Sequence, residues 1–264
     1  MEENPQQLKE LLEAEKQEFL SVMSHELRTP MTGVKGYLSM ILDGDAGEIS
    51  ADVREYIAQA YVANDKLIRL VDRMAKTVAL QEGKIKLNIQ KVNLVQNLEV
   101  LTNDFQFPAK DKGLTLTYEK PAEPIFVTAD PDRLREVLLN LISNAIKFTP
   151  TPEQKDYRMK DNKDNSLVRG FTDKGSVKIS HRTLNSWAVV DVTDTGQGIK
   201  KQDQDRIFQI FNKVNLALAG QEKGTGLGLF LARKLAEEQG GKVWLEASEE
   251  GKGSTFSAGF PKAE

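Results

Sequence analysis

The histidine and cysteine content of this chain of 264 residues limits the kinds of catalytic and metal site that it can form. The sequence has no cysteine, which excludes disulfides, thiolate catalysis and zinc bound by cysteine. It has only two histidines, His25 and His181, so a metal site with three histidine ligands is excluded as well. Any histidine chemistry must therefore use one of these two side chains.

His25 lies in a segment whose apolar residues recur with helical spacing. At about 100° per residue, this helix carries on the side opposite His25 the apolar residues Phe19, Leu20, Met23 and Leu27, which predicts a solvent-exposed imidazole. Glu26 flanks the histidine, and Thr29 lies one turn away on the same face. An exposed imidazole is a candidate nucleophile, and an adjacent carboxylate can hold its tautomer and accept a proton. On the helix alone, a surface histidine without a role is an equally good interpretation.

A further helix is predicted over residues 131–147, where Asp130 provides the N-cap and Pro131 the first helical position. One face carries Asn140 and Asn144, followed by Lys147. A solvated polar face is the usual explanation of such a pattern. Beside a glycine-rich phosphate loop, however, the amide oxygens suit Mg²⁺ and the lysine suits phosphate. The opposite face is an apolar stripe formed by Leu134, Val137, Leu138, Leu141, Ile142 and Ala145.

Two glycine-rich segments follow further along the chain. Residues 194–198 read Asp-Thr-Gly-Gln-Gly after a predicted strand, and residues 223–229 read Lys-Gly-Thr-Gly-Leu-Gly-Leu at the start of a predicted helix. An Asp-x-Gly turn is common for structural reasons alone. Its chemical interpretation is a buried carboxylate that accepts from an adenine amino group, with glycines that permit close backbone approach. The first amides of the helix can bind phosphate, although the glycine spacing differs from the dinucleotide fingerprint and from the P-loop.

The elements that must position these residues begin with a helical hairpin. Apolar residues recur at helical intervals over 6–42 and 51–82, and the polar stretch 43–50 forms the turn. The second helix has a spacing typical of bundles, with Asn64 in the seam favouring one register. Two helices with so narrow a seam cannot enclose a core, which predicts dimerisation into a four-helix bundle. Pro30 removes one backbone hydrogen bond and predicts a bend after His25, a candidate hinge.

The pattern changes after Gly83, which divides the chain into residues 1–82 and 83–264. Strand pairs joined by short turns predict an α+β layer with a mixed or antiparallel sheet rather than a doubly wound sheet. The polar segment 150–175 is predicted to be an exposed insertion. Strands are predicted over 84–90, 114–119, 125–129, 176–183, 187–193, 242–248 and 254–260, and helices over 94–110, 131–147, 200–208 and 226–239.

The charge and hydropathy of the chain limit its partners. With 36 Lys and Arg against 39 Asp and Glu, there is no basic excess for a phosphate backbone, so nucleic acid is not expected as a partner. No run approaches the roughly 20 apolar residues that cross a bilayer, and the acidic, polar start differs from a signal peptide. The sequence therefore predicts no membrane contact within this chain and a cytoplasmic location, either alone or as the cytoplasmic portion of a membrane-bound receptor.

Six motifs, in order along the chain, resemble those of sensor histidine kinases of two-component systems. The run FLSVMSHELRTP at residues 19–30 is similar to their H box, and EVLLNLISNAIKFTP at 136–150 is similar to their N box. Three more motifs are similar to the G1, F and G2 boxes, and a sixth is similar to the closing strand motif. These are DTGQGI at 194–199, IFQIF at 207–211, GTGLGL at 224–229 and GKGSTF at 251–256.

The resemblance implies a dimerisation and phosphotransfer hairpin at 1–82 and, at 83–264, an α/β sandwich of the gyrase, Hsp90 and MutL superfamily that binds ATP. It implies that His25 accepts the γ-phosphoryl group from ATP with Glu26 as general base. It also implies that Thr29 positions a water molecule that hydrolyses phosphoaspartate. The implied partners are a second copy of the chain, giving a homodimer, and the receiver domain of a response regulator. The implied cofactors are ATP and Mg²⁺.

The same resemblance assigns residues to the nucleotide. Asp194 would read adenine, Asn144 would hold Mg²⁺, and residues 209–225 would form a lid over ATP. Lys213 falls where many relatives have arginine, and it replaces a bidentate fork with a point charge. The implied nucleotide contacts are Asn140, Asn144, Lys147, Phe148, Asp194, Gly196, Gly198, Ile199, Phe211, Lys213, Gly224, Thr225, Gly226, Leu227, Gly228, Leu229 and Thr255.

Two other functions compete with an ATP-dependent protein-histidine autokinase that also has phosphatase activity. An ATPase of the wider superfamily would have a water-activating glutamate four residues before the magnesium asparagine, where this sequence has Asn140. That residue argues against efficient attack by water. A scaffold or phosphatase-only protein would bind nucleotide without phosphorylating itself, and the intact set of His25, Glu26, Asn144 and the glycines argues against it.

Overall fold

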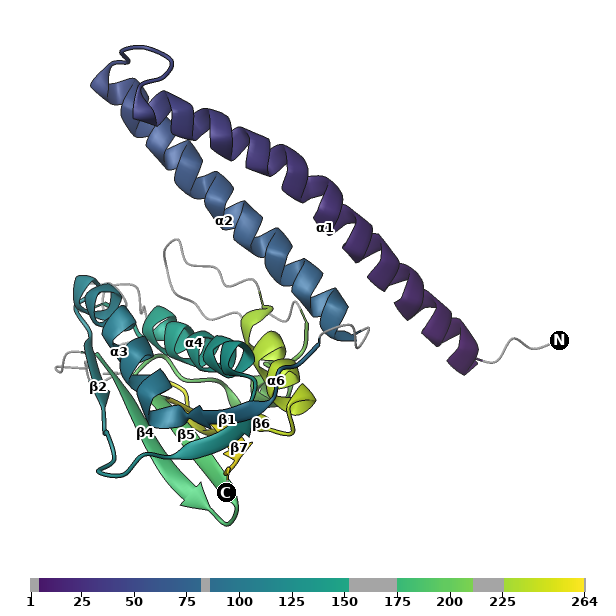
Figure 1. Cartoon of the computed structure of the whole chain (residues 1–264), viewed down its shortest axis with the longest axis vertical. Helices are drawn as coiled ribbons and strands as arrows, with labels where there is room; N and C mark the ends of the chain where they lie inside the picture. Colours follow the sequence, from purple (N-terminus) through teal and green to yellow (C-terminus); the bar gives the residue numbers. More distant parts are fainter. Residues whose placement is uncertain (1–4, 82–85, 152–174, 211–225, 264) are drawn as a thin grey trace, which may run out of the picture. The chain divides into compact units, whose positions relative to one another are not determined.

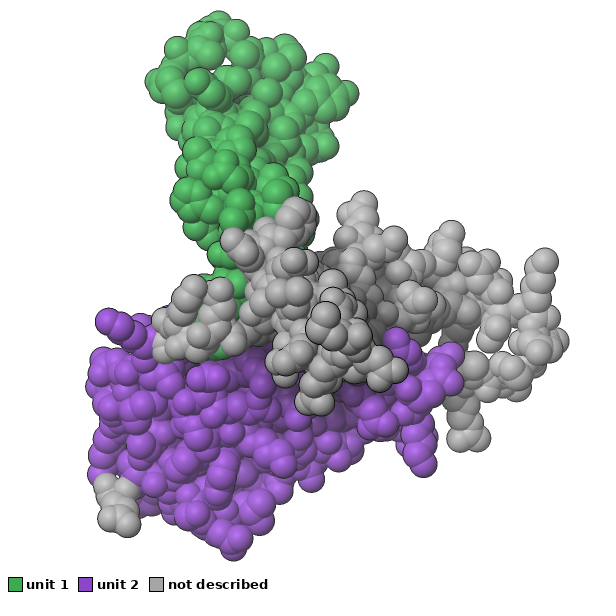
Figure 2. Space-filling view, turned by 90° about the vertical axis from the view of Figure 1, so that its right-hand side faces the viewer, with its two compact units in different colours: residues 1–85 green, residues 86–264 purple. Residues whose placement is uncertain are grey.

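The computed structural model describes residues 5–81, 86–151, 175–210 and 226–263, and within these ranges the side chains from residue 20 onward except that of residue 81. Helix α1 (Pro5–Asp43) and helix α2 (Ala51–Gln81) form an antiparallel hairpin (Figure 1). The chain divides into two compact units, residues 1–85 and 86–264, which are coloured separately in Figure 2. Most of the predicted insertion at 150–175, and residues 211–225 of the predicted lid, lie outside the described residues.

Polar side chains join the two helices of the hairpin. Asn64 is buried at 8% exposure, and its Nδ2 donates to the backbone oxygen of Met31 at 2.8 Å. This bond lies one residue beyond Pro30, and α1 continues as a helix on both sides of that proline. An ion pair between Lys35 and Asp65, with Nζ and Oδ1 2.6 Å apart, also crosses between the helices. The hairpin is therefore held in one register around the Pro30 position.

The second unit is built on a five-stranded sheet with strand order β2-β4-β5-β7-β6. Strand β2 is parallel to β4 and every other pair is antiparallel, so the predicted α+β fold with a mixed sheet is confirmed. Helices α3, α4 and α6 pack on one face of this sheet (Figure 1). The bounds are α3 (Leu94–Asp111), β2 (Thr115–Tyr118), α4 (Pro131–Phe148), β4 (Ser176–Leu184), β5 (Trp187–Asp194), α6 (Gly228–Glu238), β6 (Lys242–Glu249) and β7 (Gly253–Pro261).

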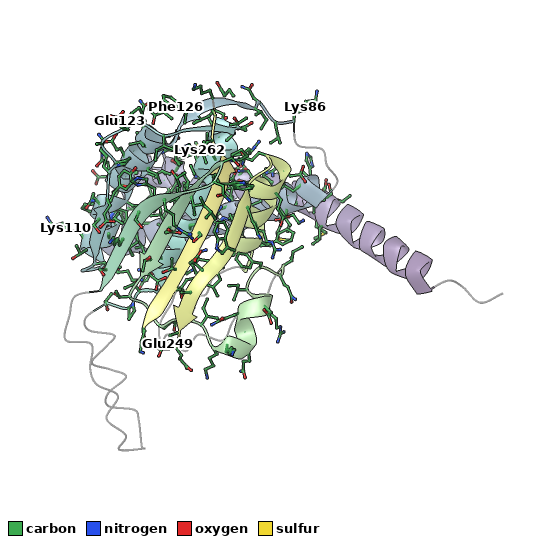
Figure 3. The ribbon with its side chains drawn as sticks, turned by 90° about the horizontal axis from the view of Figure 1, so that it is seen from below. Lys86, Lys110, Glu123, Phe126, Glu249 and Lys262 are labelled. Atoms are coloured by element: carbon green, nitrogen blue, oxygen red, sulfur yellow. The ribbon has the colours of Figure 1, made fainter. Side chains whose placement is uncertain are left out.

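The core lies between the helices and the sheet. All six residues of the predicted apolar stripe of α4 are at most 3% exposed, and they pack against β4, β5 and β7. A two-stranded sheet of β1 (Gln90–Asn93) and β3 (Phe126–Ala129) joins one end of this layer. There, Phe126 lies beside Lys262, and Val127 forms a bridge with Lys262, while Glu249 marks the other end of the sheet (Figure 3).

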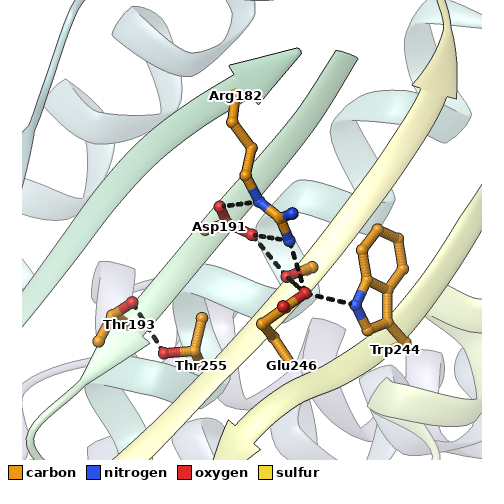
Figure 4. Close-up of polar contacts among 7 residues, drawn as sticks. Arg182, Asp191, Thr193, Trp244, Glu246 and Thr255 are labelled. Carbon is orange, nitrogen blue, oxygen red and sulfur yellow. Dashed lines mark hydrogen bonds and ion pairs between the residues drawn. The ribbon is translucent and has the colours of Figure 1, made fainter. Parts of the chain in front are cut away.

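The opposite face of the sheet carries a network of polar side chains (Figure 4). Arg182 on β4 donates to Asp191 at 2.8 Å and to Glu246 at 2.5 Å, which links three strands. Trp244 donates from its indole nitrogen to Glu246 at 2.7 Å, and Ser257 donates to Asp191 at 2.5 Å. The sheet therefore has one apolar face beneath the helices and one face held by hydrogen bonds.

Two sequence-based predictions of secondary structure are wrong. The strand predicted over 84–90 is instead β1 at Gln90–Asn93, and residues 86–89 form no strand. Its partner β3 is confined between Pro124 and Pro131, neither of which has an N–H to donate to a ladder, so β1 pairs over four residues only. The helix predicted over 200–208 is a short 3-10 helix, η1 (Lys201–Arg206). Residues 201–206 have no apolar side chain, so only Ile207 and Phe208 after them are available to pack a longer helix.

Candidate functional site

His25 projects from α1 into solvent. Its side chain is 77% exposed and that of Glu26 is 72% exposed, with Nδ1 and Oε1 3.6 Å apart, so the predicted exposure of His25 is confirmed. The hydroxyl of Thr29 donates to the backbone oxygen of His25 at 3.5 Å. These three residues form one accessible stretch of the helix surface.

The residues around His25 are anchored on both sides. Ser24 is 1% exposed and its hydroxyl donates to the backbone oxygen of Leu20 at 2.6 Å. The Nε of Arg28 donates to Asp72 of α2 at 2.8 Å. His25 is therefore presented by a fixed part of the hairpin. Asp72 was not singled out by the sequence pattern, because its pairing with Arg28 spans 44 residues.

The N-terminus of α4 is fixed by the predicted cap, Asp130. Its Oδ1 accepts from the backbone N–H groups of Asp132 and Arg133 at 3.0 and 3.1 Å. Its Oδ2 accepts from the N–H of Asn88 at 2.7 Å. Burial acts to raise the pKa of Asp130, but the three N–H groups outweigh it and hold the pKa below its usual range. The sequence identified the cap but not the link to Asn88.

The two asparagines of α4 meet the start of α6. A Cβ added to Gly228 would lie 3.3 Å from Oδ1 of Asn140 and 3.7 Å from Nδ2 of Asn144. Asn140 is 4% exposed, and its Nδ2 donates to the backbone oxygen of Glu136 at 2.9 Å. The solvated-face explanation therefore fails for Asn140. The structure therefore brings the N-box asparagines and the G2-box glycine together. Helix α6 begins at this glycine, so its first backbone N–H groups, which can bind phosphate, lie at the same place.

The end of α4 meets the loop that follows β5. The Nζ of Lys147 lies 5.6 Å from the centre of the Phe148 ring. A Cβ on Gly196 would lie 2.6 Å from the backbone oxygen of Phe148 and 2.6 Å from Oδ1 of Asp194, so only glycine fits there. The N–H of Gly196 donates to Oδ1 of Asp194 at 2.8 Å. The N box and the G1 box are thus in backbone contact.

Asp194 is the buried carboxylate that the Asp-x-Gly interpretation predicts. It is 6% exposed, and burial raises the pKa of Asp194 to about 6, while N–H groups of Gly196 and Ser254 partly oppose this increase. A carboxylate kept in a dry site at the cost of a raised pKa is typical of a functional position.

Replacing Asp194 with Asn is expected to change how stability depends on pH. The pKa of this carboxyl is ordinarily 3.8 but is about 6 in the folded chain, so the folded state holds more protons between these values. Folding stability is therefore lost as the pH rises through this window, and the cost is complete above pH 6 at about 3 kcal/mol. Asp194→Asn keeps an acceptor for Gly196 and avoids this cost.

The measurement is urea unfolding between pH 4 and pH 7, followed by tryptophan fluorescence. Both tryptophans, Trp187 and Trp244, lie in the second unit, so the signal reports that unit. The advantage of Asp194→Asn should be small at pH 4 and grow toward pH 7. An advantage that does not change with pH would contradict the assigned cause.

The second half of the G1 box packs against the turn between β6 and β7. Gly198 has φ +64°, and a Cβ there would lie 1.9 Å from the backbone oxygen of Glu249. Ile199 is 7% exposed and its N–H donates to the hydroxyl of Ser248 at 2.8 Å. Sequence reasoning missed Ser248 and Glu249, although they lie only three and two residues before the first glycine of the GKGSTF motif.

Thr255, one of the predicted nucleotide contacts, does not face Asp194. Its hydroxyl is hydrogen-bonded to that of Thr193 at 3.0 Å, and successive side chains of a strand point to opposite faces. Ser254 is the residue opposite Asp194 in the β5–β7 ladder, and its N–H bonds to that carboxyl group. The sequence motif contains both residues, and the register of β5 and β7 determines which of them lies beside Asp194.

The remaining predicted contacts lie at the start of α6 or outside the described residues. Gly226 has φ +73°, Leu227 is fully buried and Leu229 is half-buried. His181 lies in β4, outside every motif. Among the described residues, no group of three or more His, Asp or Glu side chains could hold a metal ion. The predicted contacts outside the described residues are Phe211, Lys213, Gly224 and Thr225.

Two family models match the chain. The model described as histidine kinase-, DNA gyrase B-, and HSP90-like ATPase matches residues 129–264, and the His Kinase A (phospho-acceptor) domain matches residues 15–82. In the part of the chain that the structure describes, no helix is long and apolar enough to span a membrane.

Known proteins are similar over most of this chain. The circadian input-output histidine kinase CikA of Synechococcus elongatus is 32% identical over 251 residues, which cover 94% of this chain and 30% of CikA. The signal transduction histidine-protein kinase BarA of Escherichia coli is 32% identical over 245 residues, which cover 91% of this chain and 24% of BarA. This chain thus spans less than a third of these curated relatives.

A solved structure is similar as well. The crystal structure of full-length ShkA in complex with AMPPNP superposes with a TM-score of 0.70 at 27% identity, over 93% of this chain and 46% of that one. Together with the two domain matches, these similarities identify the chain as a member of the histidine kinase-, DNA gyrase B- and HSP90-like ATPase family, with the domains of a two-component sensor histidine kinase.

Proposed function

We propose that this chain is an ATP-dependent protein-histidine kinase that phosphorylates His25 and passes the phosphoryl group to an aspartate on the receiver domain of a response regulator. The observation that carries this proposal is the convergence of three separate motifs at α4. Gly228 lies against the side chains of Asn140 and Asn144, and Gly196 lies against the backbone of Phe148. The two competing functions, an ATPase and a scaffold or phosphatase-only protein, do not require an exposed histidine beside a carboxylate on a separate helical hairpin.

In the ATP-binding unit, different residues around α4 bind different parts of the nucleotide. Asp194 accepts from the adenine amino group in its dry site, where a hydrogen bond is stronger than in water. The first amides of α6 and the ammonium of Lys147 bind phosphate oxygens. The amide oxygen of Asn144 suits Mg²⁺, which binds few protein ligands and otherwise phosphate and water. When bound, Mg²⁺ would neutralise charge on the phosphates.

In the hairpin, Glu26 prepares His25 for attack. A proton on Nδ1 faces the carboxylate 3.6 Å away, which leaves the lone pair of Nε2 free. Nε2 forms a bond to the γ-phosphorus as the bond to the leaving ADP oxygen breaks, and Glu26 stabilises the positive imidazole or accepts its proton. Phosphoryl transfer of this kind depends mainly on alignment and charge stabilisation.

Thr29 supports a second activity on the same face of α1. Its hydroxyl lies one turn from His25 and is exposed, which suits a role in orienting water toward a phosphoaspartate of the response regulator. The proposed kinase and phosphatase activities therefore share one helix surface, and the Pro30 position lies directly after it.

Exposed apolar side chains along the hairpin seam support a homodimer. In α2, Asn64 and Val71 are buried at 8% and 5% exposure, whereas Val53 and Leu67 of the same seam are 44% and 53% exposed. In α1, Val34 is likewise 48% exposed. A second hairpin would bury these side chains in a four-helix bundle, which is the arrangement that a two-helix seam lacks alone.

The experiment that tests the proposal is incubation of the chain with Mg²⁺ and ATP labelled in the γ-phosphate. The label should become attached to the protein, be lost in acid and survive alkali, as a phosphorus–nitrogen bond does. A reaction with excess EDTA is the control. Absence of label, or a label that survives acid, would overturn the proposed kinase activity.

A further inference from the structure

Lys112 joins the ends of two helices in the second unit. It is the C-cap residue of α3, and its ammonium donates to the backbone oxygens of Ile146 and Lys147 at 2.9 and 2.6 Å. These oxygens belong to the last turn of α4. Figure 3 labels Lys110, which lies in the same final turn of α3.

The base of this lysine is held by the backbone. The N–H of Gly113 donates to the oxygen of Lys110 at 2.9 Å, and the N–H of Leu114 donates to the oxygen of Ala109 at 2.8 Å. Gly113 has φ +71°, as is common where a helix ends. The side chain of Lys112 therefore extends to α4 from a helix end that is fixed by its own backbone hydrogen bonds.

The end of α4 needs such a donor. The last carbonyl groups of a helix have no partner within it, and they carry the negative end of the helix dipole. Thr149 bonds to the oxygen of Ala145 with both its N–H, at 3.1 Å, and its hydroxyl, at 2.7 Å. Lys112 supplies a positive charge to the next two carbonyl groups, those of Ile146 and Lys147. Together these contacts define the conformation of the last turn.

That last turn leads directly to the nucleotide site. Lys147 and Phe148 are its final residues, and the backbone oxygen of Phe148 is in contact with Gly196. The N–H of Gly196 in turn holds the carboxylate of Asp194 at 2.8 Å. A displacement of the carbonyl groups of α4 would therefore be passed to the loop that carries Asp194.

We propose that Lys112 is a positioning residue for nucleotide binding, and this inference rests on the proposed function of the α4 site. Lys112 acts through the α4 carbonyl groups, and it sets the position of Lys147 and Phe148 against the Asp194 loop. It belongs to none of the six sequence motifs.

The test compares substitutions in the full chain. Lys112→Met removes the donor and retains an unbranched stem, whereas Lys112→Arg restores donors that can reach two oxygens. Lys178→Met is the matched control, since Lys178 lies in β4 and forms an exposed ion pair with Glu119. At a temperature where all variants are folded by tryptophan fluorescence, Lys112→Met should raise the Kd for Mg²⁺-ADP at least roughly tenfold. Lys112→Arg should remain within about threefold of wild type, and the control should be unchanged.

Hydrogen–deuterium exchange provides a second measurement that does not depend on nucleotide. In Lys112→Met, exchange should increase both at the end of α4 and in residues 194–199, and remain unchanged in β6. Faster exchange at α4 alone, or a lower unfolding temperature with an unchanged Kd, would overturn the proposal and leave Lys112 a purely structural residue. If Lys112→Met does not fold, failure of Lys112→Arg to retain the wild-type Kd would overturn it. If wild type itself does not bind Mg²⁺-ADP, the proposed function fails, and the exchange result still decides whether Lys112 controls the Asp194 loop.

Discussion

Replacing His25 with Gln is expected to abolish the transfer of label from γ-labelled ATP to the chain, while the Kd for Mg²⁺-ADP stays at the wild-type value. Gln has no ring nitrogen to attack phosphorus, so no phosphorus–nitrogen bond forms at this position. The side chain is 77% exposed and lies outside the hairpin core, so the substitution should leave folding intact. Gln is also a better helix former than His.

The matched control for this prediction is His181→Gln, which removes the other histidine of the sequence. His181 lies in β4 and pairs with Val190, on a different unit from α1. His181→Gln should keep the acid-labile label. If His25→Gln keeps the label, or His181→Gln loses it while it still binds nucleotide, the assignment of the phosphoacceptor is wrong.

Local periodicity was enough to predict the surfaces of single helices. The exposure of His25 followed from the position of apolar residues on its own helix, and so did the burial of the α4 stripe. The cap at Asp130 followed from the Asp-Pro pair. Each of these features depends on residues within about three turns of one another, so the sequence contains the information directly.

Contacts between distant segments could not be predicted in the same way. The approach of Gly228 to Asn140 joins residues far apart in sequence, and only the resemblance to a family suggested it. Thr255 and Ser254 differ by one position, and the register with Asp194 in β5 determines which of them lies beside that carboxyl group. Lys112 belongs to no motif, because its bonds reach the end of another helix.

The second large effect is expected at Gly198, where two separate constraints require glycine. Its φ of +64° is unfavourable for other residues, at a cost of about 1 kcal/mol. In addition, a Cβ would lie 1.9 Å from the backbone oxygen of Glu249, so the G1 loop or the β6–β7 turn would have to move. Gly198→Ala should therefore lower the unfolding free energy by about 3 kcal/mol and raise the Kd for Mg²⁺-ADP at least roughly tenfold.

Gly240→Ala separates these two constraints. Gly240 has φ +74°, but a Cβ there would meet nothing within 4 Å, so only the cost of the backbone conformation of about 1 kcal/mol remains. Urea unfolding followed by tryptophan fluorescence and titration with Mg²⁺-ADP would measure both variants. Gly240→Ala should bind nucleotide normally, because it lies in the turn between α6 and β6. Equal Kd values for the two variants would mean that the backbone contact between Gly198 and Glu249 does not shape the nucleotide site. Weaker binding of Mg²⁺-ADP by Gly198→Ala alone would show that the turn before β7 supports the loop that carries Asp194.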